Sequence, residues 1–171
     1  AHRGVDPEAA PGLAREFAAI NKAVEAQPVV LMHRDFQSQN IIVHEGEIGL
    51  VDVQGMRLGP VGYDVMSLVM DPYVDIQPDL RTGLVKGWAE MAAGLPSLAG
   101  HTAAQLEAMA AAAGLQRLMQ ALGAYGYLGR VKGKRAFLAH VPTALDRLRE
   151  LIQQAKGLGS SDSNLVPEST V

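Results

Sequence analysis

The sequence predicts a mainly α-helical fold with one small β-hairpin. Several segments place apolar residues at the spacing of one helix face, and only one stretch combines short β-type runs with a two-residue turn. The chain has 171 residues, a length typical of one domain with its own core. We therefore expect about five helices arranged around a single hairpin.

The first helix is expected from Leu13 to Val24. The apolar residues of this segment lie on one helical stripe, and Pro28 follows where the pattern ends. Residues 1–12 are polar and contain several Pro and Gly residues, so we expect them to form a flexible lead.

The hairpin follows this helix. Val29–Met32 is an apolar run that we expect to be buried, and it leads into a polar loop at 33–40. Strands are predicted at 41–44 and 47–53, joined by a Glu-Gly pair. Glycine at that place suits the positive φ that a short hairpin turn requires. The two ends of the hairpin are therefore expected to lie side by side.

The ends of this hairpin carry hard oxygen ligands. Asn40 precedes the first strand, Asp52 lies at the end of the second, and Asp35 lies in the loop just before them. Two carboxylates and an amide carbonyl are the ligands that suit Mg²⁺, usually together with substrate phosphate oxygens. Any one of these residues alone is most simply read as a turn former or a helix cap. Together they follow the order H-x-D-x4-N and then D, which is the order of the protein-kinase catalytic loop.

Residues 56–60 are predicted to cross irregularly into a short helix at 65–70. Asp64 lies at the start of that helix, where an acidic side chain is favourable as a cap or first-turn residue. A second, compatible role is to accept hydrogen bonds from backbone N–H groups of the 33–40 loop.

The rest of the chain is predicted to be helical. Pro78 begins one helix, and Thr102 with Gln105 forms a capping box that begins a long Ala-rich one. A terminal helix is expected to end near Gly157. Residues 158–171 are polar and rich in turn formers, so we expect a disordered tail.

With these residues in view, the chain resembles the aminoglycoside phosphotransferase/choline kinase-like family. The resemblance rests on MHRDFQSQN, VDVQGMRLGPVGYD and SLVMDPYV, and it extends over roughly residues 13–155. These motifs are most similar to those of the bacterial branch that phosphorylates amino sugars such as N-acetylmuramate and N-acetylglucosamine at the anomeric hydroxyl. The catalytic-loop motif is specific for the superfamily, whereas the sugar-kinase assignment is less specific.

The resemblance implies a role for each motif residue. Asp35 is the general base for the acceptor hydroxyl in a catalytic loop at 33–40. Asn40 and Asp52 hold Mg²⁺ on the phosphates of ATP, the co-substrate, in a metal-binding hairpin at 40–55. Three residues are expected to support the loop: His33, Arg34 and Asp64.

The resemblance places the start of the acceptor site just after the short helix. Asp71, Tyr73 and Asp75 lie there. Two acids suit a cationic aminoglycoside, and they equally suit hydrogen bonds to sugar hydroxyls or helix caps. The residues leave the acceptor open.

The implied fold is the C-terminal lobe of a protein-kinase-like (α+β) fold, at 13–157. Residues 1–28 hold no glycine-rich loop or lysine-bearing strand, so the N-terminal lobe is expected to be absent. A missing or separately encoded N-terminal lobe is then the expected protein partner. Three alternatives stay open: a half-kinase that binds without turnover, a metal hydrolase using His33, Asp35 and Asp52, and a structural fragment.

Composition excludes several classes. The net charge of −3 argues against nucleic-acid binding, which needs clustered basic residues. The chain has no cysteine, hence no disulfides or thiolate metal site, and this fits a cytoplasmic location. No apolar run reaches the ~20 residues of a membrane span, so no membrane partner is expected.

Overall fold

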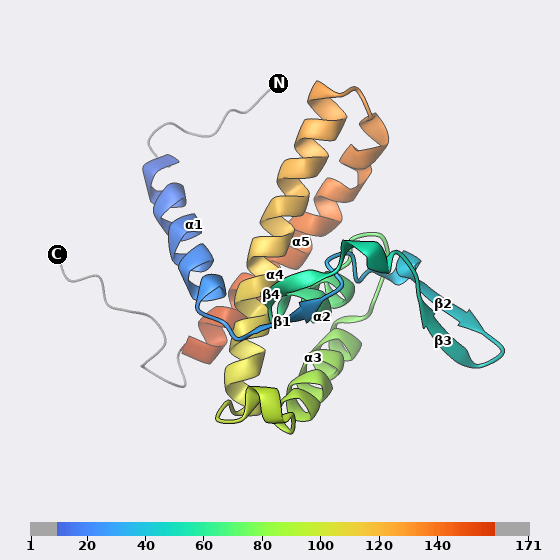
Figure 1. Cartoon of the computed structure of the whole chain (residues 1–171). Helices are drawn as coiled ribbons and strands as arrows, with labels where there is room; N and C mark the ends of the chain where they lie inside the picture. Colours follow the sequence, from blue (N-terminus) through green and yellow to red (C-terminus); the bar gives the residue numbers. More distant parts are fainter. Residues whose placement is uncertain (1–9, 160–171) are drawn as a thin grey trace.

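The computed structural model describes residues 10–159, and most of this part is helical (Figure 1). Two separate two-stranded antiparallel sheets lie among the helices. The helices are α1 (Ala10–Glu25), α2 (Tyr63–Val69), α3 (Pro78–Ala93), α4 (Ala103–Gly126) and α5 (Val141–Gly159). The strands are β1 (Val29–Met32), β2 (Ile41–His44), β3 (Glu47–Leu50) and β4 (Arg57–Pro60).

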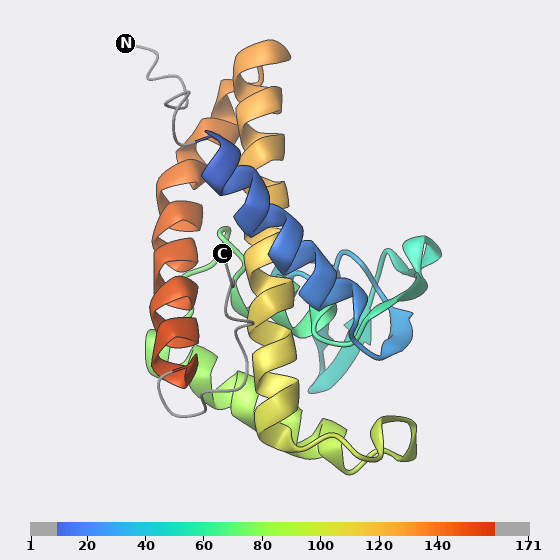
Figure 2. The same ribbon diagram turned by 90° about the vertical axis from the view of Figure 1, so that its left-hand side faces the viewer.

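The long helix α4 is the centre of the fold. It packs against each of the other four helices, and Figure 2 shows α1 crossing in front of it, with α5 at its side. It begins where predicted, because the side chain and backbone of Thr102 form a reciprocal capping box with Gln105. Its many alanines allow close packing: a Cβ on Gly62 at the start of α2 would lie only 2.6 Å from Cα of Ala110.

The core consists of two buried clusters that meet at partly buried Trp88. One joins α2, α4 and α5, and the other joins α3, α4 and Val61 at the end of β4. The fully buried members include Met66, Leu106 and Leu151. Burial of such side chains stabilises the fold by roughly 1.5–3 kcal/mol each.

The run Val29–Met32 forms strand β1, but the prediction that it is buried was wrong. Val29 and Leu31 are 63% and 62% exposed, whereas Val30 packs against the core and Met32 is buried. The segment expected as an irregular crossing is also regular, since it forms β4 and pairs with β1 in antiparallel register. The two strands make a ribbon with one covered face, and alternate side chains therefore point to solvent.

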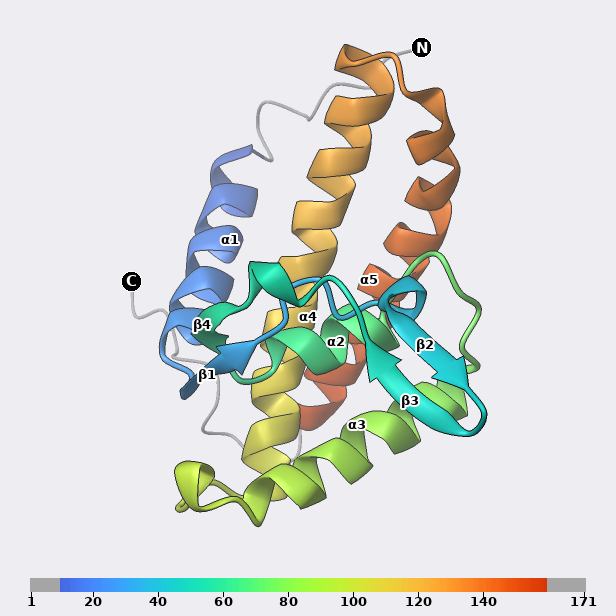
Figure 3. The same cartoon turned by 45° about the vertical axis from the view of Figure 1, so that its right-hand side comes forward.

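The predicted hairpin is present as β2 and β3; Figure 1 shows it projecting from the helical body, and Figure 3 shows it turned forward. Glu45 and Gly46 both have positive φ, at 50° and 83°, as a two-residue type I′ turn requires. The second strand ends at Leu50, three residues earlier than predicted. Asp52 has φ of +65° and is left-handed, which is incompatible with an extended strand.

The ends of the described chain differ slightly from the predictions. Helix α1 begins at Ala10, inside the lead expected at 1–12, and α5 extends to Gly159 rather than ending near Gly157. The remainder of that lead and of the tail expected at 158–171 lies outside the described residues. No helix of the described part is both long and apolar enough to cross a membrane.

Candidate functional site

The loop at 33–40 is held at its start by one carboxylate. Asp64, in the first turn of α2, accepts hydrogen bonds from the backbone N–H groups of His33 (2.6 Å) and Arg34 (3.0 Å). These are the contacts that the sequence suggested. Arg34 has φ of +77°, a conformation that costs a non-glycine residue roughly 1–3 kcal/mol. The two charge-assisted bonds compensate for this strain and fix the direction of the loop.

Two side chains of the loop reach across to the segment that follows β3. His33 is 5% exposed, and its Nε2 lies 2.9 Å from the backbone oxygen of Val51. A carbonyl oxygen only accepts, so Nε2 carries the proton and donates. Arg34 donates from its guanidinium to the backbone oxygen of Gly55 at 3.3 Å. The loop and the far end of the hairpin are thereby tied together.

Asp71 holds the other end of the loop. It is only 1% exposed, and its carboxylate accepts from the backbone N–H and the hydroxyl of Ser38 and from the backbone N–H of Tyr73. Of the residues expected at the acceptor site, Asp71 thus faces inward, whereas Tyr73 and Asp75 are exposed. Asp75 lies 3.7 Å from a guanidinium nitrogen of buried Arg147.

Asn40 brings the three oxygen-bearing residues together. Its side-chain Nδ2 donates to the backbone oxygen of Asp35 at 2.8 Å, and its own backbone oxygen accepts from Val51 at 3.1 Å. Asp52 follows Val51 directly. The Asp35 carboxylate is exposed, and within residues 10–159 no hydrogen bond reaches it. These bonds bring the backbone of Asp35, Asn40 and the residue before Asp52 together at the base of the hairpin.

The donors at this place fit a magnesium ion. The bond from Asn40 Nδ2 to Asp35 leaves the amide Oδ1 of Asn40 free, and Asp52 is exposed with one carboxylate oxygen accepting from Gln54. In the described chain no three His, Cys, Asp or Glu residues could hold a metal ion together. A site with two protein ligands suits Mg²⁺, which commonly keeps water and phosphate oxygens as its other ligands.

The geometry disfavours the metal-hydrolase alternative. That alternative uses His33 as a ligand beside Asp35 and Asp52. The imidazole is instead buried, its Nε2 is occupied by Val51, and its Nδ1 is enclosed without a partner. A buried ring that braces the backbone supports the loop rather than binding a metal at its surface.

Sequence reasoning missed two residues close to the loop at 33–40. Tyr63 is half-buried at the start of α2, and its hydroxyl donates to Gln120 of α4 at 3.5 Å. Burial raises the pKa of Tyr63, Arg117 opposes the rise, and Asp35 and Asp64 add to it. The sequence offered one signal for Arg117, because it is the single cationic residue of the long Ala-rich helix α4.

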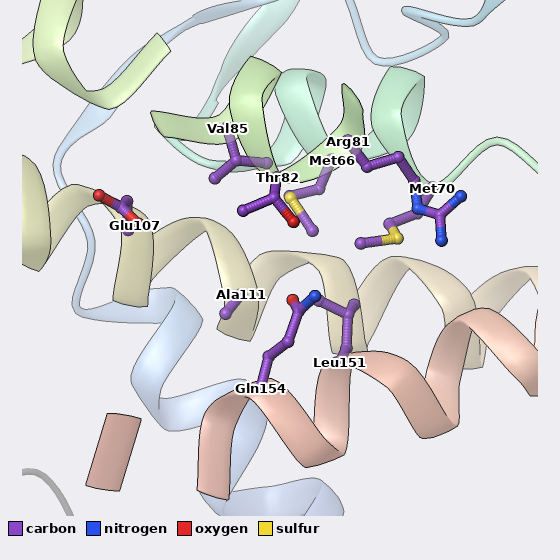
Figure 4. Close-up of a pocket in the computed structure, with 9 residues that line it drawn as sticks. All are labelled: Met66, Met70, Arg81, Thr82, Val85, Glu107, Ala111, Leu151 and Gln154. Carbon is purple, nitrogen blue, oxygen red and sulfur yellow. The ribbon is translucent and has the colours of Figure 1, made fainter. Parts of the chain in front are cut away.

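A separate cavity lies between α2, α3, α4 and α5 (Figure 4). It has a volume of about 60 Å³, and its lining includes Met66, Thr82 and Gln154. None of the predicted site residues lines it. The cavity belongs to helix packing, and the chemistry-bearing side chains gather at the loop and the hairpin instead.

Comparison with known proteins gives one family and several relatives. Residues 1–101 match the model described as the phosphotransferase enzyme family. The chain is 32% identical over 130 residues to an N-acetylmuramate/N-acetylglucosamine kinase of Neisseria meningitidis, covering 74% of this chain and 38% of that protein. A protein of the same name from Pseudomonas aeruginosa is 30% identical over 153 residues, which is 82% of this chain and 44% of the relative. The chain thus spans less than half the length of these relatives.

Proposed function

Since the chain belongs to the phosphotransferase enzyme family, we propose that it carries the catalytic lobe of an ATP-dependent kinase that phosphorylates a hydroxyl of an amino sugar or a similar small molecule. The single observation that carries the proposal is the site around Asn40, which joins Asp35 to the base of the hairpin beside Asp52. The kinases named above, both acting on amino sugars, support this class of acceptor.

In the proposed reaction the acceptor oxygen attacks the γ-phosphorus of ATP, and the bond to the β–γ bridging oxygen breaks to release ADP. The exposed carboxylate of Asp35 accepts the proton of the attacking hydroxyl. Asn40 and Asp52 hold Mg²⁺, which neutralises charge on the phosphates when bound. Asp64 and Asp71 bind the backbone at the two ends of the loop, so that Asp35 keeps its orientation. Placing these groups in advance supplies most of the catalysis.

We assign the chain to the C-terminal lobe of a kinase-like fold, with an N-terminal lobe as its partner. Two observations support the assignment: the match covers only 38% of the Neisseria relative, and large apolar side chains of the strands are exposed. These exposed residues are Val29, Leu31, Ile42, Val43, Ile48, Leu50 and Leu58. They leave apolar side chains uncovered on both ribbons next to the site, and a second lobe that covers part of them would also close the ATP site. A half-kinase that binds without turnover is the second candidate, favoured by the same partial length. We place either activity in the cytoplasm.

The test is transfer of labelled phosphate from Mg·ATP to N-acetylmuramate, N-acetylglucosamine, an aminoglycoside and choline. It is run on this chain and on the complete product of its gene. We expect transfer to an amino sugar and a loss of at least about 100-fold in kcat for Asp35→Asn, the size of a general-base effect. The variant Asp52→Asn keeps the shape and the tolerance of positive φ but removes a metal-binding charge, so activity falls while unfolding is unchanged.

Binding of an amino sugar without any phosphate transfer in the complete product supports the half-kinase instead. Unchanged kcat in both Asp35→Asn and Asp52→Asn contradicts the catalytic site proposed here.

A further inference from the structure

Arg117 is a cation without a counter-ion beside the catalytic loop. Its side chain is half-buried in the middle of α4, yet no hydrogen bond or ion pair within the described chain reaches its guanidinium. Nε is enclosed without a partner, whereas the two terminal nitrogens are not among the enclosed atoms. Partly buried guanidinium groups normally have a carboxylate or phosphate partner, because removal from water is costly. An anion from outside the described chain would complete this site.

The surroundings of Arg117 place it under the loop. It lines a water-sized hollow together with Gln37 of the loop, Ser67 of α2 and Tyr125 of α4. The Ser67 hydroxyl is also enclosed without a partner, and its residue is only 3% exposed. Two polar atoms without partners, Nε of Arg117 and the Ser67 hydroxyl, therefore belong to residues lining this hollow at the junction of the loop with α2 and α4.

Tyr63 links Arg117 to the catalytic carboxylate. Burial raises the pKa of Tyr63, Arg117 lowers it and Asp35 adds to the rise. That hydroxyl also bonds Gln120, which lies one helical turn beyond Arg117 on α4. Arg117 therefore lies beside the loop residue Gln37, two positions after Asp35, and about one helical turn from the residue that the Tyr63 hydroxyl contacts.

We propose that Arg117 binds the carboxylate of an acidic amino-sugar acceptor, so that the site favours an acceptor with a carboxyl group over its neutral counterpart. The inference rests on the proposed function and names the acceptor class. Of the two sugars in the names of the relatives, N-acetylmuramate carries a lactyl carboxylate and N-acetylglucosamine carries none. Arginine suits this task because its planar donors match a carboxylate bidentately.

The phosphoryl group in transfer is the other anion that Arg117 could meet. The two roles differ in what they change. A contact to the acceptor carboxylate sets the affinity for acidic acceptors and leaves kcat for neutral ones unaltered. A contact to the phosphoryl group changes kcat for every acceptor equally.

The experiment measures binding without ATP, by calorimetry on the complete gene product. The probes are N-acetylmuramate, its neutral lactyl amide and N-acetylglucosamine. We expect the wild type to bind the acid about 10- to 100-fold more tightly than the amide, the value of a hydrogen bond to a charged group. Arg117→Gln removes this preference but retains binding of N-acetylglucosamine, and Arg117→Lys restores part of it.

Arg15→Gln, an exposed position on α1, is the matched control and keeps the preference. Circular dichroism melts of each variant establish that it is folded.

Equal binding of acid and amide by the wild type overturns the inference, as does a preference that survives in Arg117→Gln or an absence of binding. Transfer to N-acetylglucosamine together with any of these results leaves the proposed function standing, so the two failures are distinguishable. In the phosphate-transfer assay described above, an equal loss of kcat for all acceptors in Arg117→Gln assigns the residue to the phosphoryl group. That result overturns the carboxylate role.

Discussion

Asp64 shows how one side chain can determine the shape of the site. Its two oxygens bind the backbone N–H groups of His33 and Arg34, and the second of these residues has a strained positive φ. Without the carboxylate, two partly buried donors lose their acceptor and the strained loop loses its restraint. The arrangement of Asp35 therefore depends on a residue about thirty positions later in the chain.

We predict that Asp64→Ala lowers the free energy of unfolding by about 2–3 kcal/mol, because each unsatisfied donor costs roughly 1–3 kcal/mol. Chemical denaturation measures this change. Asp64→Asn retains one acceptor oxygen, so its free energy of unfolding falls by less than that of Asp64→Ala.

The control is Asp79→Ala, an exposed first-turn acid of α3. The free energy of unfolding of this control falls by less than about 1 kcal/mol, as expected for an exposed charge at a helix N-terminus. Equal losses at positions 64 and 79 would show that Asp64 acts only as a first-turn acid.

At the scale of elements, α2 is placed by its contact with α4. A Cβ on Gly62 would lie 2.6 Å from Cα and 2.9 Å from N of Ala110, which are backbone atoms that cannot rotate away. By contrast, a Cβ on Gly123 in α4 would point into open space, with nothing beyond its own stretch of helix within 4 Å. The two glycines therefore separate close packing from intrinsic helix propensity.

We predict opposite effects for the same substitution at these sites. Gly62→Ala destabilises the protein by about 1–3 kcal/mol through overpacking. Gly123→Ala stabilises it by roughly 0.5–1 kcal/mol, because alanine is the better helix former. Thermal unfolding followed by circular dichroism checks both. A gain at both positions would mean that α2 does not pack on α4 as closely as described.

For the whole molecule, a buried ion pair connects distant parts of the chain. Arg81 of α3 is 2% exposed and binds the Glu150 carboxylate of α5 and the backbone oxygen of Ile76. A second buried cation, Arg147, lies nearby, and its pKa is lowered first by burial and then by Arg81. Glu150 thus pairs directly with buried Arg81 and also raises the pKa of Arg147, whose ion-pair partner is Asp75.

Glu150→Gln is predicted to lower the free energy of unfolding by about 3 kcal/mol, because it leaves buried charge without its counter-ion. Equilibrium unfolding in urea measures the change. Glu90→Gln, on the exposed face of α3, is the control and changes stability by less than about 0.5 kcal/mol. If Arg81→Met destabilises the protein no more than Glu90→Gln does, the pair does not hold α3 to α5.

Local patterns predicted much of the fold. The capping box of Thr102, the proline that begins α3 and the Glu-Gly turn act among residues within a few positions of one another, and each was recognisable in the sequence. The strand β4 and the exposure of β1 were not predictable in this way. They depend on two segments separated by the whole hairpin, whose pairing leaves one face of the ribbon in solvent.

The same division applies to the site. The sequence by itself determined that the segment before Asp52 returns to Asn40, because a tight turn between two paired strands brings their outer ends together. Only the tertiary structure decided that Asp71 faces the loop and that Arg117 lies beneath it without a counter-ion. Those two positions depend on how helices pack across large sequence separations, and the free energy of that packing comes from contacts with no local signature.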